Sequence, residues 1–182
     1  NLRLEKILEE RNKDDLLQAV KSIVPSSSNI VYTRQSEPLG LGHAIWCARD
    51  IVGDEPFAVM LADDLIQSEV PVLHQMVNEF DRLRASMMAI VEVPKEETYR
   101  YGIIEAEKGY NGTVQVKSMV EKPAPEDAPS NLAVIGRYIL TPKIFDYLGK
   151  KQKGAGGEIQ LTDAMSALLQ EQPIFGYKFK GK

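Results

Sequence analysis

The 182-residue sequence is long enough for one domain with a sizeable hydrophobic core. Its 43% hydrophobic and 26% charged residues are typical of a globular protein, and no apolar run is long enough to span a bilayer. The net charge of -4, with basic residues scattered among acidic ones, provides no basic face for a phosphate backbone. Neither a nucleic acid nor a membrane is therefore expected as a partner.

The start of the chain and its cysteine content indicate where the protein works. The opening residues, "NLRLEKILEERNKDD", are charged and helical in pattern, so they lack the basic and apolar regions of a secretion signal. The single cysteine, Cys47, excludes an internal disulfide and a cysteine-based zinc cluster. We therefore expect a cytoplasmic protein.

Helices and strands alternate in the first half of the chain. The helices have apolar residues near a 3.6-residue period, and the strands are short, apolar and rich in β-branched residues. Ser68 is placed to cap the last of these helices. The expected elements are one broken or two short helices over residues 2–24, a strand at 29–33, a helix at 41–52, a strand at 57–61, a helix at 69–84 and a strand at 86–93. This order predicts an α/β fold with a mixed, mostly parallel sheet flanked by helices.

After Pro94 the pattern indicates a β-rich second half with more antiparallel pairing. Strand-like segments are separated there by Gly, Asn or Pro loops. The expected elements are strands at 101–107, 112–123 and 131–140, a helix at 141–148 capped by Thr141, a helix at 156–171 and a final strand at 173–180. No linker divides the halves, so we expect a single domain over residues 1–182.

Two adjacent carboxylates, Asp63 and Asp64, follow the strand at 57–61. Ligands of open α/β sheets bind at the carboxyl ends of strands, and Mg²⁺ is commonly held by one or two carboxylates together with substrate phosphates. A turn in which one aspartate caps the backbone would use the same residues. From this pair alone, both interpretations stay open.

Three other classes of protein also place an acid at such a strand end. A P-loop ATPase requires G-x-x-x-x-G-K-[ST], which does not occur in the sequence. A phosphate-accepting signalling domain would place its acceptor aspartate at the end of the next strand, where this chain has "VEVPKEE". A dinucleotide-binding oxidoreductase would need G-x-G-x-x-G, of which "GLGHAI" supplies only the first two glycines. All three fit the chain poorly.

Three further segments combine polar groups with glycine or proline. In "RQSEPLGLGHAI", Gln35 can pair with the edge of a base, and the glycines let a ligand approach the backbone. In "VEKP", Lys122 suits a phosphate and Glu121 suits sugar hydroxyls, while "GAGGEIQLTDA" places Glu158 before a helix. A plain loop, a solvated ion pair or an ordinary helix start explains each segment alone at least as well. Only their combination is informative.

In combination and in this order, the motifs resemble those of one enzyme family: "RQSEPLGLGHA", "LADDLI", "YGIIE", "VEKP", "SNLAVIGRYIL" and "GEIQLTDA". The chain is similar over nearly its whole length to the bacterial UTP:glucose-1-phosphate uridylyltransferases, or UDP-glucose pyrophosphorylases, of the sugar nucleotidyltransferase superfamily. The resemblance implies a Rossmann-like nucleotidyltransferase fold and the Mg²⁺-dependent synthesis of UDP-glucose and pyrophosphate from UTP and glucose 1-phosphate. The alternatives are a thymidylyltransferase acting on glucose 1-phosphate, which "GEIQLTDA" disfavours, and a non-catalytic UDP-sugar-binding or assembly fragment.

The resemblance also implies roles for individual residues, with residues 1–94 as the nucleotide-binding half and 95–182 as the sugar-binding half. It assigns catalytic roles to the Mg²⁺ ligand and to the lysine that holds the sugar phosphate, and it leaves Asp64 in a supporting position. By role, the implied site residues are Gln35 and the backbone of Gly40 for uracil, Asp63 for the metal, Gly102, Glu121 and Glu158 for glucose, and Lys122 for the sugar phosphate. Relatives assemble as dimers or tetramers, so a homo-oligomer is expected.

The sequence departs from the family pattern at its two ends. The family's G-x-G-T-R segment, which grips the triphosphate, does not precede Asn1. A second metal-binding aspartate is expected beyond Lys182. The resemblance therefore predicts an internal fragment that turns over poorly or not at all by itself.

Overall fold

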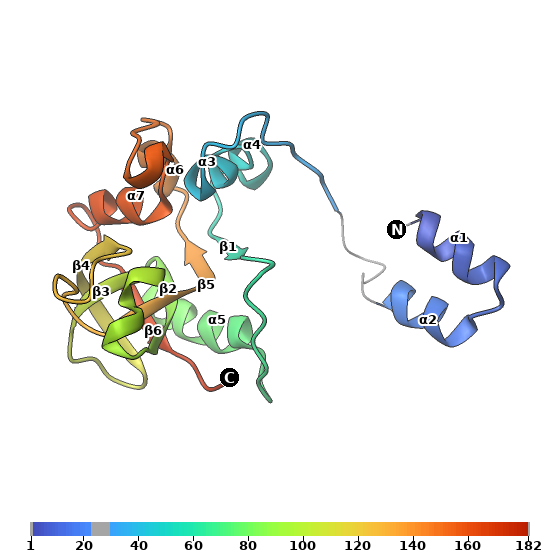
Figure 1. Ribbon diagram of the computed structural model, residues 1–182, viewed down its shortest axis with the longest axis horizontal. Coiled ribbons are helices and arrows are strands. Elements are labelled where there is room, and N and C mark those ends of the chain that lie inside the picture. Colours follow the sequence, from blue (N-terminus) through green and yellow to red (C-terminus); the bar gives the residue numbers. More distant parts are fainter. Residues whose placement is uncertain (1, 23–29, 182) are drawn as a thin grey trace. The chain divides into compact units, whose positions relative to one another are not determined.

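The computed structural model describes residues 2–22 and 30–181 (Figure 1). The chain divides into two compact units, Asn1–Tyr32 and Thr33–Lys182. The described part of the first unit contains two short helices, α1 (Leu2–Glu10) and α2 (Asp14–Ser22), so two short helices replace the one broken helix that the pattern also allowed. Residues 23 and 24 of the predicted helical segment lie outside the described residues. The single domain expected over residues 1–182 stays a prediction.

The prediction of a strand at residues 29–33 is wrong for the residues of that segment that the structure describes. Residues 30–33 have no regular secondary structure, and residue 29 lies outside the described part of the chain. The side chains of Ile30, Val31 and Tyr32 are exposed. β-branched and aromatic residues favour a strand through packing on a half-buried sheet surface. Because no described strand pairs with residues 30–33, their local preference for a strand is not realised.

The second unit is built on a six-stranded sheet. Each strand overlaps a segment that the sequence predicted as a strand, and the α/β fold with a mixed sheet is confirmed. The strands are β1 (Phe57–Met60), β2 (Met87–Glu92), β3 (Gly102–Glu107), β4 (Thr113–Glu121), β5 (Leu132–Leu140) and β6 (Phe175–Lys178). Their spatial order is β1-β5-β2-β6-β4-β3, with an additional pairing of β5 with β3.

Parallel pairing is less common among the described strands than the sequence predicted. β2 and β6 are parallel, whereas the other described pairings are antiparallel. β1 and β2 do run in the same direction, because both are antiparallel to β5, but β5 lies between them. The strand and helix order therefore indicated their direction correctly, and a strand from much later in the chain changed their neighbours.

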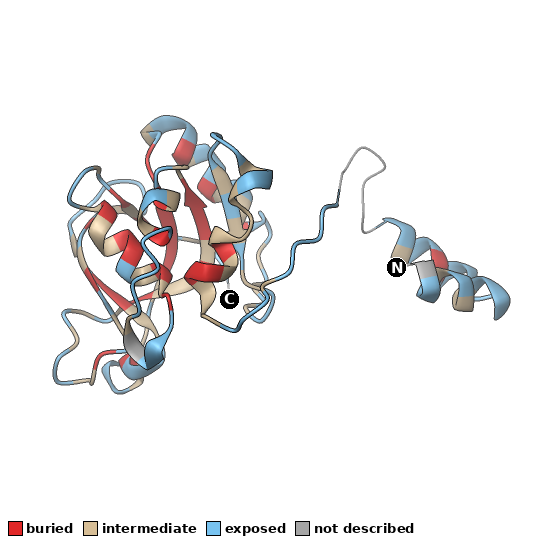
Figure 2. Ribbon diagram, turned by 90° about the horizontal axis from the view of Figure 1, so that it is seen from above, coloured by how far each residue is buried: buried red, intermediate tan, exposed pale blue. Residues whose placement is uncertain are grey.

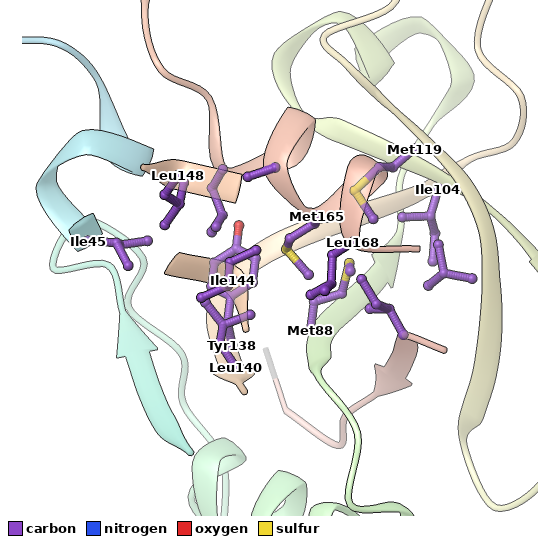
Figure 3. Packing of buried hydrophobic residues seen from close by; sticks show 14 of the residues in the cluster. Ile45, Met88, Ile104, Met119, Tyr138, Leu140, Ile144, Leu148, Met165 and Leu168 are labelled. Carbon is purple, nitrogen blue, oxygen red and sulfur yellow. The ribbon is translucent and has the colours of Figure 1, made fainter. Parts of the chain in front are cut away.

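Helices pack on both faces of this sheet (Figure 1). Alternate residues of β2 contact different helices, as the two-residue period of a strand requires. Met87 and Ala89 pack with residues of α5, whereas Met88 and Ile90 pack in a larger cluster with residues of α6 and α7 (Figure 3). Buried residues concentrate on the strands and on the helix faces turned toward them (Figure 2). The core therefore has one hydrophobic layer on each side of the sheet.

The helices of the second unit follow the predicted segments with shorter bounds. They are α3 (Leu41–Trp46), α4 (Arg49–Val52), α5 (Val72–Leu83), α6 (Ile144–Leu148) and α7 (Leu161–Leu168), with short 3-10 helices η1 (Lys95–Arg100) and η2 (Ala155–Gly157). The helix predicted at 41–52 is two helices, because the backbone tightens to a turn in which Ala48 N–H bonds to Ile45 O at 3.0 Å. No helix in the described ranges is both long and apolar enough to cross a membrane.

Neither predicted helix cap is observed. Pro71, not Ser68, precedes the first residue of α5, and the Ser68 hydroxyl lies 2.5 Å from Lys180 O instead. Lys143, not Thr141, precedes α6. The Thr141 hydroxyl lies 3.2 Å from Ser86 Oγ, which also accepts the Thr141 N–H at 3.0 Å. Both hydroxyls that were predicted as caps therefore make a contact with a residue far along the chain, and that of Ser68 also lies 2.7 Å from Val70 O.

Replacing Ser86 by alanine is expected to destabilise the second unit, because Ser86 is fully buried and its hydroxyl satisfies the Thr141 backbone. The expected loss is about 1–3 kcal/mol in the free energy of unfolding. Urea unfolding followed by circular dichroism measures it. In the control, Ser118→Ala removes a hydroxyl bonded to Glu105 at an exposed position and should change stability by less than about 0.5 kcal/mol. Equal losses in both variants would contradict the assignment.

Candidate active site

The site lies where one edge of β5 is divided between two strands. β1 pairs with the C-terminal part of β5 from Arg137 to Leu140, and β3 pairs with Leu132 and Ala133 near its start. Between them, no described strand pairs with residues 134–136 along this edge. A cavity of about 290 Å³ lies here. Because this edge is divided, the sheet is open at the point where β1 and β4 end and β3 begins.

This cavity brings together several residues that the sequence analysis assigned to a site. Its lining comes from β5, from the segment that follows β1, from the end of β4 and the residue after it, from the end of η1 and the start of β3, and from the starts of α3 and α7. The predicted residues among the lining are Asp63, Gly102, Glu121 and Lys122. A larger hollow of about 840 Å³ beside α5 and the end of β6 contains none of the predicted site residues. We therefore take the smaller cavity as the candidate site.

The other predicted site residues, Gln35, Gly40 and Glu158, do not line this cavity but adjoin it. Gln35 Nε2 donates a hydrogen bond to Gly40 O at 3.0 Å. A Cβ added to Gly40 would lie 2.7 Å from the Cβ of Glu158, so these two residues are in direct contact. Their chain neighbours Leu41 and Gln160 do line the cavity. The predicted residues thus form two adjoining groups.

Close approach of another backbone segment explains the two glycines of "LGLG". Ile159 N–H donates to Leu39 O at 2.7 Å, and Gly42 N–H donates to Ile159 O at 2.9 Å. A Cβ on Gly42 would lie 2.6 Å from Ile159 O, and Gly40 has φ +95°, which other residues rarely adopt. Segments 39–42 and 158–160 therefore require glycine in order to meet.

The two adjacent aspartates have different environments. Asp64 is half-buried, and its Oδ2 accepts the Gly136 N–H at 2.7 Å. The Arg137 guanidinium donates to Asp64 O at 2.6 Å and to Leu61 O at 3.1 Å. Asp63 is exposed, lines the cavity and has no hydrogen-bond partner among the described residues. The loop is therefore held to β5 through Asp64 and Arg137, and the Asp63 carboxylate stays available to a ligand.

Thr162, at the start of α7, orients the carboxylate of Glu121. Its hydroxyl donates to Glu121 Oε2 at 2.5 Å. Gly102 pairs with Glu121 across β3 and β4, and a Cβ there would lie 3.3 Å from the same oxygen. Glycine therefore leaves room for the carboxylate, and the threonine fixes one of its oxygens. Sequence reasoning missed Thr162, although it belongs to the quoted "GEIQLTDA", because its position was assigned to an ordinary helix start.

Lys122 follows β4 directly in an unusual backbone conformation. Its φ of +48° lies in the left-handed region, which costs a residue other than glycine roughly 1–2 kcal/mol. Its N–H donates to Tyr101 O at 3.0 Å, which holds this turn in place. No partner for its ammonium group is found in the described ranges. The other cation of the cavity, Arg100, forms an ion pair with Glu97 at 3.0 Å.

Tyr138 contributes a phenol that sequence reasoning also missed. It is buried, lines the cavity from β5, and is shown with its hydroxyl in Figure 3. Burial, together with the nearby carboxylates of Glu121 and Asp64, raises the pKa of Tyr138 well above its usual value. A phenol is protonated at neutral pH even at its usual pKa, and the raised pKa extends this to higher pH, so Tyr138 can donate a hydrogen bond into the cavity. In the sequence, Tyr138 belongs to the quoted "SNLAVIGRYIL", but that motif was interpreted only as a strand and gave the tyrosine no role.

The carboxylates of the site do not form a preformed metal cage. Within the described residues, no group of three or more His, Cys, Asp or Glu side chains is arranged to hold a metal ion. Mg²⁺ binds readily to one or two protein carboxylates when substrate phosphates and water complete its shell. The exposed carboxylate of Asp63 fits that kind of site with both oxygens available, whereas Asp64 has one oxygen, Oδ2, engaged by the Gly136 N–H.

Comparison with known proteins identifies the family. The nucleotidyl transferase profile matches residues 3–182. The chain belongs to the nucleotidyl transferase family. It is 52% identical over 179 residues to the UTP--glucose-1-phosphate uridylyltransferase of Bacillus subtilis (strain 168), a match that covers 98% of this chain and 61% of the relative. The chain thus spans about three fifths of the length of that relative.

Two solved structures are similar to this chain to different degrees. A UDP-glucose pyrophosphorylase complexed with UDP-glucose has a TM-score of 0.89 and 46% identity, covering 94% of this chain and 65% of that one. A putative glucose-1-phosphate thymidylyltransferase from Bacillus anthracis has a TM-score of 0.68 and 23% identity, covering 84% and 57%. The second likeness shows a shared fold alone. The predicted resemblance to the uridylyltransferases is confirmed.

Substitutions of the two aspartates should change the free energy of unfolding by different amounts. Asp64→Ala removes the acceptor of the Gly136 N–H and is expected to lower the free energy of unfolding by about 1.5–3 kcal/mol. Asp63→Ala is the matched control, and it should change stability by less than about 0.5 kcal/mol, because this carboxylate is exposed. Urea unfolding of both variants tests the difference. If Asp64→Ala were as stable as the control, its bond to β5 would not anchor the loop.

Proposed function

We propose that this protein transfers a uridylyl group from UTP to glucose 1-phosphate, giving UDP-glucose and pyrophosphate. The observation that carries the proposal is the convergence of Asp63, Gly102, Glu121 and Lys122 on one cavity in a chain 52% identical to a uridylyltransferase. The thymidylyltransferase alternative is less well supported, since the identity to such a protein is 23%. A purely binding or assembly role would give UDP-glucose binding without release of pyrophosphate from UTP.

In the proposed reaction, a phosphate oxygen of glucose 1-phosphate attacks the α-phosphorus of UTP in line. The new oxygen–phosphorus bond forms as the bond to the β-phosphate oxygen breaks, and pyrophosphate leaves with the bonding electrons. Lys122 would hold the sugar phosphate, since its ammonium group is exposed at the cavity. No covalent enzyme intermediate is needed, because the protein contributes positioning and charge neutralisation.

Mg²⁺ is the cofactor in this proposal, and Asp63 is the residue that would hold it. A bound Mg²⁺ would neutralise charge on the phosphates of the nucleotide. The anchoring of this loop by Asp64 and Arg137 supports the role, because it places the Asp63 carboxylate on a fixed backbone.

The sugar and the base would be bound by the two adjoining groups of residues. Glu121, fixed by Thr162, can accept hydrogen bonds from glucose hydroxyls, with Gly102 beside it. Glu158 would reach the sugar from the adjoining group, where it touches Gly40. Gln35 and the backbone of Gly40 would read the uracil. Three expectations from the sequence stay predictions: assembly as a dimer or tetramer, a cytoplasmic location, and weak turnover by these 182 residues alone.

UDP-glucose binding with and without Mg²⁺ tests the metal assignment. Calorimetry should show that Mg²⁺ increases the affinity for UDP-glucose. In Asp63→Asn this increase should be smaller by about tenfold or more, because a neutral amide is a poor ligand for a hard cation. Without Mg²⁺ the variant should bind like the original protein. An affinity for UDP-glucose that changes neither with Mg²⁺ nor with the substitution would contradict the role of Asp63. Release of pyrophosphate on addition of UTP and glucose 1-phosphate, even at a low rate, would identify an enzyme and contradict a purely binding role.

Thr162→Val tests the sugar pocket with nearly the same side-chain volume. Loss of the bond to Glu121 should weaken UDP-glucose binding by about tenfold or more, as expected for a hydrogen bond to a charged group. UDP, which lacks the sugar, should bind with unchanged affinity, and Thr162→Ser should restore UDP-glucose binding. Equal weakening of UDP and UDP-glucose would place Thr162 outside the sugar pocket.

A further inference from the structure

The hydrogen bonds of Gln35 determine which way its side-chain amide points. The amide nitrogen lies 3.0 Å from Gly40 O and 3.0 Å from His43 Nδ1. A carbonyl oxygen can only accept, so the group that faces Gly40 must be the NH₂ and not Oε1. Both NH₂ hydrogens are therefore engaged. No described residue donates to Gln35 Oε1, so the group that the side chain offers to a ligand is an acceptor.

The same bonds determine the tautomer of His43. Because the Gln35 NH₂ donates to Nδ1, this nitrogen carries a lone pair and the ring proton is on Nε2. Nε2 lies 3.9 Å from Cys47 Sγ, a weak acceptor that suits this proton. The side chain is 8% exposed, and its ring stacks on Trp46 with 6.0 Å between centroids. His43 is thus held by packing with its acceptor nitrogen toward Gln35.

An amide fixed in this orientation can distinguish uracil from cytosine. The pairing edge of uracil has an N3–H donor between two carbonyl oxygens, whereas N3 of cytosine carries a lone pair. An outward-facing Oε1 can accept from the N3–H of uracil but meets the N3 lone pair of cytosine as a second acceptor. If the amide could turn over, its NH₂ would suit cytosine instead. Selectivity of this kind requires that the polar groups of the site cannot rearrange.

We infer that His43 is a positioning residue that makes the nucleotide site selective for uracil over cytosine, by fixing the side-chain amide of Gln35. The inference rests on the proposed function, in which Gln35 reads the base. Gly40 O alone holds the amide less firmly, because it also accepts the Ala44 N–H at 3.2 Å. His43 supplies the second acceptor at Nδ1, and the contact of its Nε2 with Cys47 Sγ is compatible with the tautomer that this requires.

Two substitutions of His43 separate this role from simple packing. His43→Asn keeps an acceptor oxygen on the atom that corresponds to Nδ1, and His43→Leu has no acceptor. Both lose the ring that stacks on Trp46, so they are matched for that effect. Thermal unfolding of each variant verifies the fold. Calorimetry then gives the affinities for UDP-glucose and CDP-glucose, and their ratio is the readout.

The original protein is expected to prefer UDP-glucose, and His43→Asn should keep most of that preference. In His43→Leu, the ratio of the affinity for UDP-glucose to that for CDP-glucose should fall by about tenfold, which corresponds to the loss of one orienting hydrogen bond. An unchanged ratio in His43→Leu, or an equal loss in both variants, would overturn the inference. If the original protein binds neither sugar nucleotide, the proposed function itself fails.

The tautomer gives a test that needs no substitution. In ¹⁵N NMR spectra of the original protein, His43 should show a protonated Nε2 and an unprotonated Nδ1 at neutral pH. A proton on Nδ1 would face the Gln35 NH₂ donor to donor, and its detection would overturn the inference. This result does not depend on any nucleotide, so it separates failure of the positioning role from failure of the proposed function.

Discussion

The division of one edge of β5 is the constraint on which the rest of the site depends. A strand has two edges, and here β2 occupies one while β1 and β3 share the other. Gly136 and Arg137 also fall out of register with β2, in a bulge between the partners of Met88 and Ala89. Bulges re-aim groups that a regular ladder would use. Their polar groups instead bond to the loop after β1, so the sheet itself anchors the residues beside Asp63.

The anchoring of Asp64 is one example of an arrangement that the charged residues of the cavity share, in which a neighbouring group holds part of each residue in place. Asp64 is engaged by a backbone N–H and Glu121 by a hydroxyl, and the backbone of Lys122 is held by Tyr101 O. The supporting contacts fix the chain, while the Asp63 carboxylate and the Lys122 ammonium are exposed at the cavity. Charged groups on fixed backbone need little reorganisation when a phosphate binds, which is the main contribution expected of a phosphoryl-transfer site.

The sequence predicted the strands of this sheet and four residues of the cavity, because short apolar runs and the polar groups at their ends are local features. It did not predict that β5 separates β1 from β2, since strand neighbours depend on contacts between distant segments. The same limit applies to Arg137, Tyr138 and Thr162. Each lies in a segment whose pattern is that of an ordinary strand or helix, and its role arises from a partner far along the chain.

The segment "LGLGHA" shows how packing and recognition can use the same few residues. Its glycines are required because Ile159 approaches the backbone on both sides of Leu41, and its histidine faces Gln35. Ile159 lies between Glu158, which touches Gly40, and Gln160, which lines the cavity. The base side and the sugar side of the proposed site are therefore joined through one backbone bridge. A substitution at either glycine would move both sides together, so selectivity for the base and for the sugar cannot change independently at these positions.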